Sequence, residues 1–503
     1  MDRDRKAHLV AIPYPGRGHI NPMMNLCKLL VSKSPSIYVT FVVTEEWLAL
    51  VGSDPKPDTI RFACIPNVIP SESIRALDFP AFIEAVLTKM EDPVERLLDA
   101  LDKPVIAIIA DTYLFWAVRV ANKRDIPIAS LWTMSASVFT VFDHFELLLV
   151  HRHFPADLSG LSDRLANYTT PTLSNRGDEI VEYIPGLPPT RLADLTTFFG
   201  VRGRVTLQRA LDCFPWVPKT QYLLFTNFYE LESSVIDALK AKFSMPIYTV
   251  GPTIPYFELE LDCSSSISLG LGAGPHQHHR PSYLQWLDSQ PTASVLYISL
   301  GSFLSVSREQ MTELVTGVRE SGVKFLWVSR DLEENWLSDW FRGSCGIDEE
   351  KGVIVPWCNQ LMVLSHPSVG GFWTHCGLNS TLEAIYAGVP ILAFPIFWDQ
   401  VPNSKLIAED WKIGWRVKRP VAVGEEEQQQ LVVSGVEIAG VIRKFMDLES
   451  DEQMQLRRRA MELQEICRQA IQPGGSSYSN IDAFASEISK LGCFLDRFIH
   501  VID

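Results

Sequence analysis

Residues 352–400 read GVIVPWCNQLMVLSHPSVGGFWTHCGLNSTLEAIYAGVPILAFPIFWDQ, and this stretch decides the fold. Within it, short apolar runs of strand length alternate with runs of helical pattern. The pattern predicts strands at Gly352–Val355, Val369–Thr374 and Ile391–Phe394, separated by helices at Asn359–His366 and Ser380–Ala387. Strands that alternate with helices are typical of a parallel sheet covered by helices.

The alternation continues on both sides of this stretch. Upstream, strands are predicted at Ser294–Leu300 and Lys324–Val328, and the helix Ser307–Glu320 between them begins with the capping-box pair Ser307 and Gln310. The first third of the chain repeats the pattern, with strands predicted at His8–Pro13, Tyr38–Val43, Ile60–Cys64, Val105–Ala110 and Ile126–Leu131, and helices at residues 79–101 and 113–124. The sequence therefore predicts an α/β fold with two doubly wound domains.

The length of the chain agrees with two domains. Its 503 residues are too many for a single hydrophobic core. We predict a first domain at residues 1–250, a linker and mobile loop at 251–281, and a second domain at 282–475. The last residues, 476–503, have the pattern of an amphipathic helix and are expected to pack back on the first domain.

Charge and cysteine usage exclude several classes of protein. The net charge of −15 opposes binding to nucleic acid. The nine cysteines form no C-x-x-C pair, which indicates reduced thiols rather than a disulfide framework or a zinc site. The charged N-terminal residues do not have the pattern of a secretory leader, so we do not expect secretion, and the apolar runs are far below the roughly 20 residues of a membrane span. We expect a cytoplasmic monomer without stable membrane insertion.

Two polar side chains follow strands of the first domain. His19 lies in the glycine-rich loop after the first strand, ahead of a helix that Asn21 and Pro22 are predicted to open, and Asp111 follows the strand ending at Ala110. Ligands of open α/β sheets bind beyond the carboxyl ends of the strands. A carboxylate that fixes the tautomer of a histidine makes it a general base for a hydroxyl group. Alternatively, both residues merely cap helices, and the residues alone leave the two interpretations open.

The same loop also invites a dinucleotide interpretation. Gly16-Arg17-Gly18 follows a strand, and Glu45 stands at a suitable distance for a ribose contact. However, Asn21 occupies the place of the third glycine in the G-x-G-x-x-G fingerprint. The fingerprint is broken, which disfavours an oxidoreductase of the NAD class.

The deciding stretch carries the polar groups that a nucleotide-sugar site needs. The strand that ends near His375, Gly377 and the helix start at Asn379 together offer amide N–H groups and a helix N-terminus to a diphosphate. An aromatic face for the base, a carboxylate for the ribose and polar groups for the sugar are supplied by Trp357, Glu383, Asp399 and Gln400. Each residue has an ordinary structural alternative, but chance explains the whole set poorly.

The segment Trp357–Gln400 resembles, nearly throughout, the signature box of the plant UDP-sugar-dependent glycosyltransferases of secondary metabolism, the family 1 UDP-glycosyltransferases. The resemblance extends over essentially the whole chain, to Gly18-His19, Asp111, Trp132-Thr133, Gly251-Pro252 and Ser299–Ser302. It implies a GT-B fold, in which two Rossmann-like domains face a central cleft. The first domain would bind the acceptor and the second the UDP-sugar.

The resemblance also implies roles for individual residues. His19 becomes the catalytic base and Asp111 its partner. The UDP-sugar would be bound by Gly18, Thr133, Ser302, Trp357, Cys358, Gln360, His375, Gly377, Leu378, Asn379, Ser380, Glu383, Asp399 and Gln400. Leu378 is a departure, because the family usually has tryptophan there. A main-chain N–H contact at this position would tolerate leucine, whereas loss of an indole packed on the sugar would alter donor affinity or choice.

We therefore predict inverting transfer of a sugar, glucose in particular, from a UDP-sugar to a hydroxyl or carboxyl group of a small lipophilic acceptor. Alternatives are a UDP-sugar epimerase and a non-catalytic small-ligand-binding protein. Neither a metal nor a cofactor is predicted, because the histidines of Pro275–His279 are expected to be solvated and the only Asp-x-Asp triplet is Asp2-Arg3-Asp4. Six aromatic residues could line an acceptor pocket, but their helical spacing favours core positions: Phe79, Phe82, Trp116, Phe139, Phe142 and Phe145.

Overall fold

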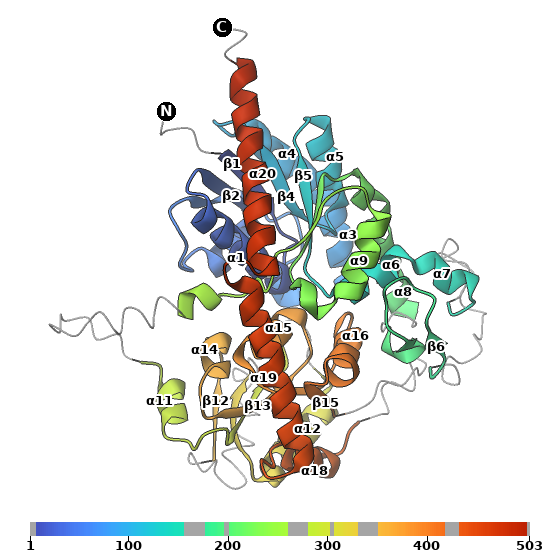
Figure 1. The fold of residues 1–503 in the computed structure, drawn as a ribbon, viewed down its shortest axis with the longest axis vertical. Coiled ribbons are helices and arrows are strands. Elements are labelled where there is room, and N and C mark those ends of the chain that lie inside the picture. The colour runs from blue at the N-terminus through green and yellow to red at the C-terminus, as the bar shows by residue number, and fades with distance from the viewer. Residues whose placement is uncertain are drawn as a thin grey trace, which may run out of the picture. The chain divides into compact units, whose positions relative to one another are not determined.

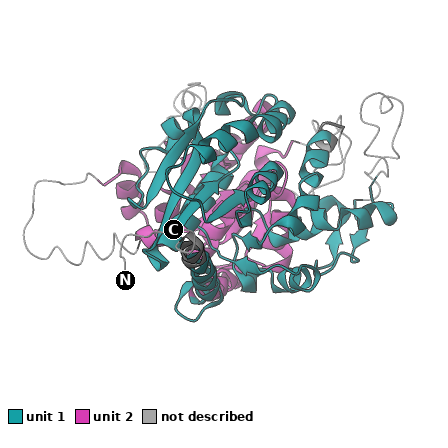
Figure 2. Ribbon diagram, turned by 90° about the horizontal axis from the view of Figure 1, so that it is seen from above, with its two compact units in different colours: residues 1–253, 469–503 teal, residues 254–468 magenta. Residues whose placement is uncertain are grey.

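The computed structural model describes residues 7–154, 177–195, 201–259, 280–301, 306–329, 351–417 and 432–499, of which residues 201–204 and 492–499 are described by their backbone. Ser302, the cluster Pro275–His279 and Asp2-Arg3-Asp4 lie outside the described residues. The chain divides into two compact units, coloured separately in Figure 2. Unit 1 comprises Met1–Thr253 and Gln469–Asp503, and unit 2 comprises Ile254–Arg468. The chain returns to unit 1 at Gln469, before the boundary that we placed after residue 475.

Unit 1 is built on a seven-stranded parallel sheet in the order β3-β2-β1-β4-β5-β8-β9 (Figure 1). Its strands are β1 (Ala7–Ile12), β2 (Ile37–Thr44), β3 (Ile60–Ile65), β4 (Ala107–Asp111), β5 (Ile128–Trp132), β8 (Tyr222–Phe225) and β9 (Ile247–Thr249). The first five match the predicted strands to within two residues at each end. The strand order reverses between β1 and β4, which creates a switch point at the carboxyl ends of these two strands.

Helices of unit 1 pack on this sheet and bury its apolar residues. They are α1 (Arg17–Lys33), α2 (Glu45–Val51), α3 (Phe79–Lys89), α4 (Glu91–Asp99), α5 (Phe115–Lys123), α6 (Ala136–Asp143), α7 (Phe145–Val150), α8 (Val201–Leu211), α9 (Ser233–Lys242) and α20 (Ser476–Ile499), with short turns η1 (Glu72–Ile74), η4 (Leu192–Asp194), η5 (Phe214–Lys219) and η6 (Tyr229–Leu231). A small antiparallel pair, β6 (Ile180–Val181) and β7 (Thr190–Arg191), completes the described elements. The predicted helix at residues 79–101 is divided at Met90.

The six aromatic residues considered for an acceptor pocket belong to the interior. Phe82, Trp116 and Phe139 are fully buried, and Phe79 packs against the core cluster formed by β1, β4 and the helices α3 to α5. Phe142 and Phe145 are also buried. The core interpretation favoured by their helical spacing is therefore confirmed.

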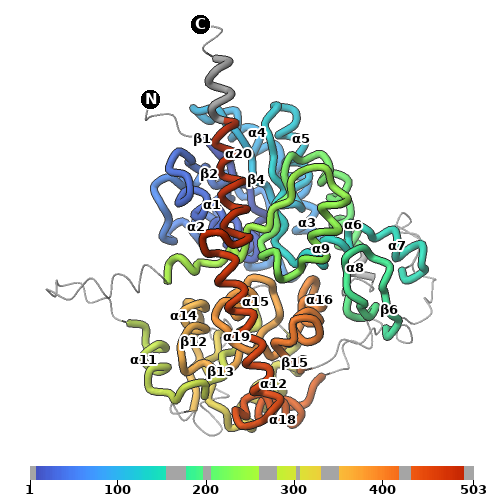
Figure 3. The backbone as a smooth tube through the Cα atoms, viewed as in Figure 1, coloured from blue at the N-terminus to red at the C-terminus, as the bar shows by residue number. Residues whose placement is uncertain are grey.

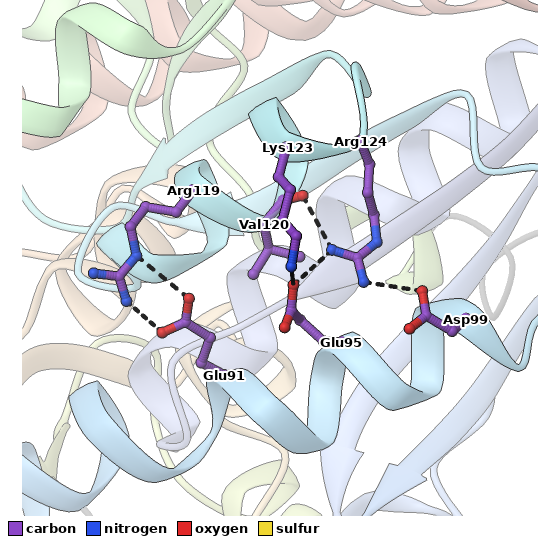
Figure 4. Close-up of polar contacts among 7 residues, drawn as sticks. All are labelled: Glu91, Glu95, Asp99, Arg119, Val120, Lys123 and Arg124. Carbon is purple, nitrogen blue, oxygen red and sulfur yellow. Dashed lines mark hydrogen bonds and ion pairs between the residues drawn. The ribbon is translucent and has the colours of Figure 1, made fainter.

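Ion pairs join α4 to α5 outside this core (Figure 4). Glu95 accepts hydrogen bonds from Lys123 Nζ at 3.2 Å and Arg124 Nη1 at 2.7 Å, and Arg124 also binds Asp99 at 2.9 Å. These bonds lower the pKa of the Glu95 carboxyl. Because exposed pairs each contribute only about 0–1 kcal/mol, the buried face of the two helices supplies most of their attachment.

Helix α20 packs against β9 and α1 of unit 1 (Figure 3). Phe484 is fully buried and meets the ring of Tyr222 edge-on at 5.4 Å between centroids. The hydroxyl of Tyr248 donates to Glu487 at 3.0 Å, and Asn480 Nδ2 donates to the carbonyl of Thr249 at 3.1 Å. Apolar and polar contacts thus hold the C-terminal helix on the end of the sheet formed by β8 and β9.

Unit 2 repeats the design with a six-stranded parallel sheet in the order β12-β11-β10-β13-β14-β15. Its strands are β10 (Val295–Ser299), β11 (Lys324–Val328), β12 (Gly352–Val355), β13 (Val369–Thr374), β14 (Ile391–Ala393) and β15 (Gly414–Arg416). Its helices are α11 (Ser282–Asp288), α12 (Arg308–Ser321), α14 (Gln360–Leu364), α15 (Leu378–Ala387), α16 (Gln400–Lys405), η8 (Leu406–Asp410), α18 (Gly435–Phe445) and α19 (Asp451–Ile471), the last of which passes into unit 1 after Arg468. A second switch point lies between β10 and β13.

The predicted capping box at α12 is only half formed. Ser307 Oγ accepts the N–H of Gln310 at 3.2 Å, as expected of an N-cap. The Gln310 side chain does not return this bond, because it pairs with both the N–H and the carbonyl of Val433. The Gln310 side chain therefore binds the main chain of Val433, which is distant in sequence, instead of the N-terminus of its own helix.

Two predictions about the whole chain can be compared with the described residues. The cysteines among them are free, and all of them except Cys64 are buried. Of the helices within these residues, none has both the length and the apolar character that crossing a bilayer would require.

Candidate active site

His19 lies in the first turn of α1, at the switch point between β1 and β4. The helix has Gly16 as its N-cap, and the N–H groups of His19 and Ile20 both donate to the Gly16 carbonyl at 2.9 Å. The predicted helix start at Asn21 and Pro22 is therefore wrong, since Pro22 lies inside the helix. His19 is held by regular backbone rather than by a loop.

The imidazole of His19 is paired with Asp111. Nδ1 of His19 lies 2.7 Å from Oδ2 of Asp111 and 2.9 Å from Oγ1 of Thr133. Asp111 is buried, and its other oxygen accepts the N–H of Tyr113 at 3.0 Å, so the carboxylate is fixed. An ionised carboxylate can only accept, so Nδ1 carries the proton and Nε2 presents a lone pair. This is the tautomer that a general base requires.

The surroundings of His19 leave room for a reacting group. The His19 side chain is 22% exposed, with the rings of Tyr14 and Tyr113 at centroid distances of 5.0 and 6.3 Å. A Cβ added to Gly18 would meet nothing within 4 Å. Internal packing therefore does not demand a glycine at this position.

His375 lies at the switch point of unit 2, directly after β13. Its ring is closely flanked by two glycines, because a Cβ on Gly301 or on Gly377 would lie only 2.7 or 2.6 Å from His375 Nε2. Although part of the residue remains exposed, close packing lowers the pKa of His375 to about 4. The imidazole is therefore neutral at pH 7 and carries one N–H.

Helix α15 opens directly behind His375, with Gly377 as its N-cap. Leu378, Asn379 and Ser380 form its first turn, and the N–H groups of a first turn point toward the helix N-terminus. Leu378 is only 3% exposed, so its side chain belongs to the interior. The geometry agrees with a main-chain contribution from this position, which a leucine supplies as well as a tryptophan.

Gln360 lies beside the first turn of α15 and pairs with Glu383 of the same helix. Trp357 follows β12 and is 68% exposed, so a face of its indole is open to a ligand. Gln360 Nε2 donates to Oε2 of Glu383 and, at 2.9 Å, to Oγ of Ser380. Burial raises the pKa of Glu383 to about 7, against the opposing effect of the Gln360 bond. Cys358 is buried, so only its main chain is suited to reach a ligand.

Asp399 and Gln400 stand at the start of α16 with their orientations fixed. Gln400 Oε1 accepts the N–H groups of Ile396 and Phe397, both at 2.9 Å, which directs its amide nitrogen away from these two groups. Asp399 Oδ2 accepts from Asn403 Nδ2 at 2.8 Å, and the same nitrogen reaches the carbonyl of Cys376 at 3.0 Å. The sequence analysis missed Asn403, although its position four residues after Asp399 on a helix was a usable signal.

Comparisons with known proteins agree with this arrangement. Residues 267–418 match the family model described as UDP-glucoronosyl and UDP-glucosyl transferase. The chain is 50% identical to UDP-glycosyltransferase 87A2 of Arabidopsis thaliana over 96% of its length and 97% of the relative's length. It belongs to the plant family 1 UDP-glycosyltransferases. The enzyme is therefore a glycosyltransferase that takes its sugar from a UDP-sugar, which sets aside the epimerase and the non-catalytic binding protein.

Solved structures of UDP-glycosyltransferases share the fold. Medicago truncatula UGT71G1 complexed with UDP-glucose has a TM-score of 0.74 and 25% identity, over 97% of this chain and 99% of that chain. Phytolacca americana UGT2 complexed with UDP-2fluoro-glucose and pterostilbene has a TM-score of 0.73 and 25% identity, over 97% and 100%. The fold of this UDP-glycosyltransferase is GT-B, as the resemblance implied.

The raised pKa of Glu383 predicts that replacing this residue with glutamine stabilises the enzyme at alkaline pH. The pKa of about 7 in the fold lies above the unfolded value of about 4.3, so the stability that its neutral form contributes is complete below the unfolded pKa and is lost as pH rises through 7. Glu383→Gln replaces the carboxyl group with an amide, which does not ionise as pH rises. We expect its free energy of unfolding to exceed that of the wild type by about 1–3 kcal/mol at pH 8, with a much smaller difference at pH 5.

Thermal unfolding of both proteins at the two pH values measures this difference. Glu449→Gln, at an exposed carboxylate, is the matched control and should show no pH-dependent gain. Equal free energies of unfolding for Glu383→Gln and wild type at pH 8 would show that the ionised Glu383 carboxylate does not destabilise the fold.

Proposed function

We propose that this UDP-glycosyltransferase transfers glucose from UDP-glucose, with inversion, to a hydroxyl or carboxyl group of a small lipophilic acceptor, using His19 as general base. The observation that carries the proposal is the 2.7 Å contact between His19 Nδ1 and Asp111 Oδ2, which leaves Nε2 as the basic nitrogen. One solved relative holds UDP-glucose, and another holds UDP-2fluoro-glucose together with pterostilbene. The ligands of these relatives support the proposed donor and the proposed class of acceptor.

In the proposed reaction, unit 1 supplies the base. Nε2 of His19 takes the proton of the acceptor hydroxyl as its oxygen attacks the anomeric carbon from the side opposite UDP. Asp111 stabilises the imidazolium that forms, and Thr133 Oγ1 shares the Nδ1 proton. A single displacement inverts the anomeric centre, so an α-linked donor gives a β-linked product. A carboxylate acceptor is already ionised and needs the base less.

Unit 2 would hold the UDP-sugar. We assign uracil stacking to the exposed face of Trp357, and the ribose hydroxyls to Glu383 and Gln360. Diphosphate binding is assigned to the main-chain and side-chain donors of Ser302, His375, Gly377, Leu378, Asn379 and Ser380. Asp399 and Gln400 would bind the sugar, and the fixed amide of Gln400 supports a preference for glucose. Dipoles and donors aimed at the diphosphate stabilise the charge that develops on UDP as it leaves.

Donor binding should depend on Trp357. Stacking of a base on an aromatic ring is worth about 1–3 kcal/mol, so Trp357→Ala should raise the dissociation constant for UDP by about 5- to 150-fold. Isothermal titration with UDP measures this change. Val436→Ala, which trims another exposed apolar residue of unit 2, should bind UDP like the wild type. Unchanged affinity in Trp357→Ala would refute the proposed uracil site.

Turnover should survive chelation of divalent metals. The proposed site meets the diphosphate with N–H dipoles and polar side chains, so no metal ion is assigned a role in stabilising the leaving group. Initial rates with UDP-glucose and a phenolic acceptor should agree in the presence and absence of EDTA. Loss of activity that added Mg²⁺ or Mn²⁺ restores would contradict this proposal.

The His19–Asp111 pair should act as one catalytic unit. A positioned base contributes about 10²–10⁴-fold, so His19→Ala should lower kcat with a hydroxyl acceptor by that factor while the affinity for UDP stays nearly constant. Asp111→Asn should also be strongly impaired, because its amide allows the wrong imidazole tautomer and removes the charge partner of the imidazolium. The double variant should be scarcely slower than His19→Ala.

A second histidine–carboxylate pair of unit 1 provides the matched control. His153 Nε2 lies 3.0 Å from Glu179 Oε2, and His153→Ala should retain wild-type kcat. Strictly multiplicative losses in the double-mutant cycle would mean that His19 and Asp111 act independently. Near-normal turnover by a folded His19→Ala enzyme would remove the general-base mechanism.

A further inference from the structure

Tyr297 lies in β10 with a hydroxyl group that packing does not require. The residue is 1% exposed, and its ring stacks on Phe372 with centroids 4.9 Å apart and an interplanar angle of 16°. A phenylalanine ring would fill the same space. Because a buried hydroxyl costs free energy unless it is hydrogen-bonded, the partners of this hydroxyl indicate its purpose.

The hydroxyl connects two residues of the loop and helix that follow β12. It donates to Gln360 Oε1 at 3.0 Å and lies 3.4 Å from Cys358 Sγ, and it also has a hydrogen bond with the side chain of Ser299 in its own strand. A phenol has a single proton, so when this proton is given to Gln360 the thiol must be the donor to the phenol oxygen. The bonds therefore run in one direction, from Cys358 through Tyr297 to the carbonyl of Gln360.

The other end of the Gln360 amide holds Glu383. Gln360 Nε2 donates to Glu383 Oε2 and to Ser380 Oγ. If the amide were reversed, its oxygen would face the carboxylate and repel it. Tyr297 thus favours the one amide orientation in which Gln360 can bind an ionised Glu383.

We propose that Tyr297 is a positioning residue for recognition of the donor ribose, acting through Gln360 on Glu383. With Oε2 bound to Gln360, Glu383 presents Oε1 to a ribose hydroxyl. This inference rests on the proposed ribose-binding role of Gln360 and Glu383.

The link operates through hydrogen bonds rather than charge. Burial raises the pKa of Tyr297 well above its usual range and that of Cys358 to about 11, so both groups are neutral at pH 7. Glu383 is the ionisable group at the end of the chain of bonds. Removing the Tyr297 hydroxyl should therefore change the geometry at Glu383 without adding or removing a charge.

Tyr297→Phe tests the inference through the preference for ribose over deoxyribose. The wild type should bind UDP more tightly than 2′-deoxy-UDP, because Glu383 accepts from the ribose hydroxyls. In Tyr297→Phe we expect this preference to shrink by about 2- to 10-fold, the effect of one neutral hydrogen bond, mainly through weaker binding of UDP. The KM for UDP-glucose should rise with little change in kcat. The variant keeps the ring and its stacking on Phe372, so the fold should be retained, and circular dichroism checks this.

Two further variants separate positioning from a general loss of packing. Tyr386→Phe removes the phenol hydroxyl of another tyrosine in unit 2, whose ring stacks on Tyr256, and should keep the wild-type preference. In a Gln360→Ala background, Tyr297→Phe should have no further effect on the preference. A wild-type preference in Tyr297→Phe would overturn the role of Tyr297. A wild-type enzyme that does not distinguish UDP from 2′-deoxy-UDP would instead overturn the proposed ribose site.

Discussion

Reversal of strand order in each parallel sheet is the constraint on which the rest of the structure depends. Strands on the two sides of a switch point send their following segments away from each other, and this leaves the carboxyl ends of the two central strands uncovered. In unit 1 these ends place His19 after β1 and Asp111 at the end of β4. In unit 2 they place Gly301 after β10 and His375 after β13. Both candidate sites are thus consequences of topology before any side chain is considered.

The two switch points are then specialised by different local devices. At the first, a partly exposed histidine is oriented by a buried carboxylate. At the second, Gly301 and Gly377 close tightly on the His375 ring. One arrangement leaves an imidazole accessible with a defined lone pair, whereas the other immobilises an imidazole beside a helix N-terminus. The first suits proton transfer, and the second suits an anion.

The sequence was sufficient where local pattern determines structure. β11, β12 and β13 begin and end at the predicted residues, because each is an apolar run bounded by polar residues, glycine or proline. β8, β9 and β15 were not predicted, although β12 and β14, which are equally short, were found because they stand within the strand and helix alternation of residues 352–400. The start of α1 was misplaced because Pro22 suits a first turn, whereas Gly16 ends the loop earlier.

Contacts between distant residues set the limit of the sequence analysis at the sites. The pairing of His19 with Asp111 was accessible, because the switch-point rule brings the ends of two known strands together. The contact of Thr133 with Nδ1 of His19 follows no such rule, and neither does the contact of Tyr297 with Gln360. They depend on side-chain directions that only the assembled sheet defines. Motif reasoning therefore found the residues proposed to touch the ligand more readily than those that orient them.

The donor site, as proposed, contains two groups whose pKa values are shifted toward the neutral form, and a bound ligand would oppose both shifts. Packing lowers the pKa of His375 to about 4, and burial raises that of Glu383 to about 7. A diphosphate beside His375 favours the imidazolium and would raise its pKa, while ribose hydroxyls that donate to Glu383 favour the carboxylate and would lower its pKa. Proton uptake at His375 and proton release at Glu383 would have opposite signs. Binding of the donor would thus favour the charged form of both groups that face it.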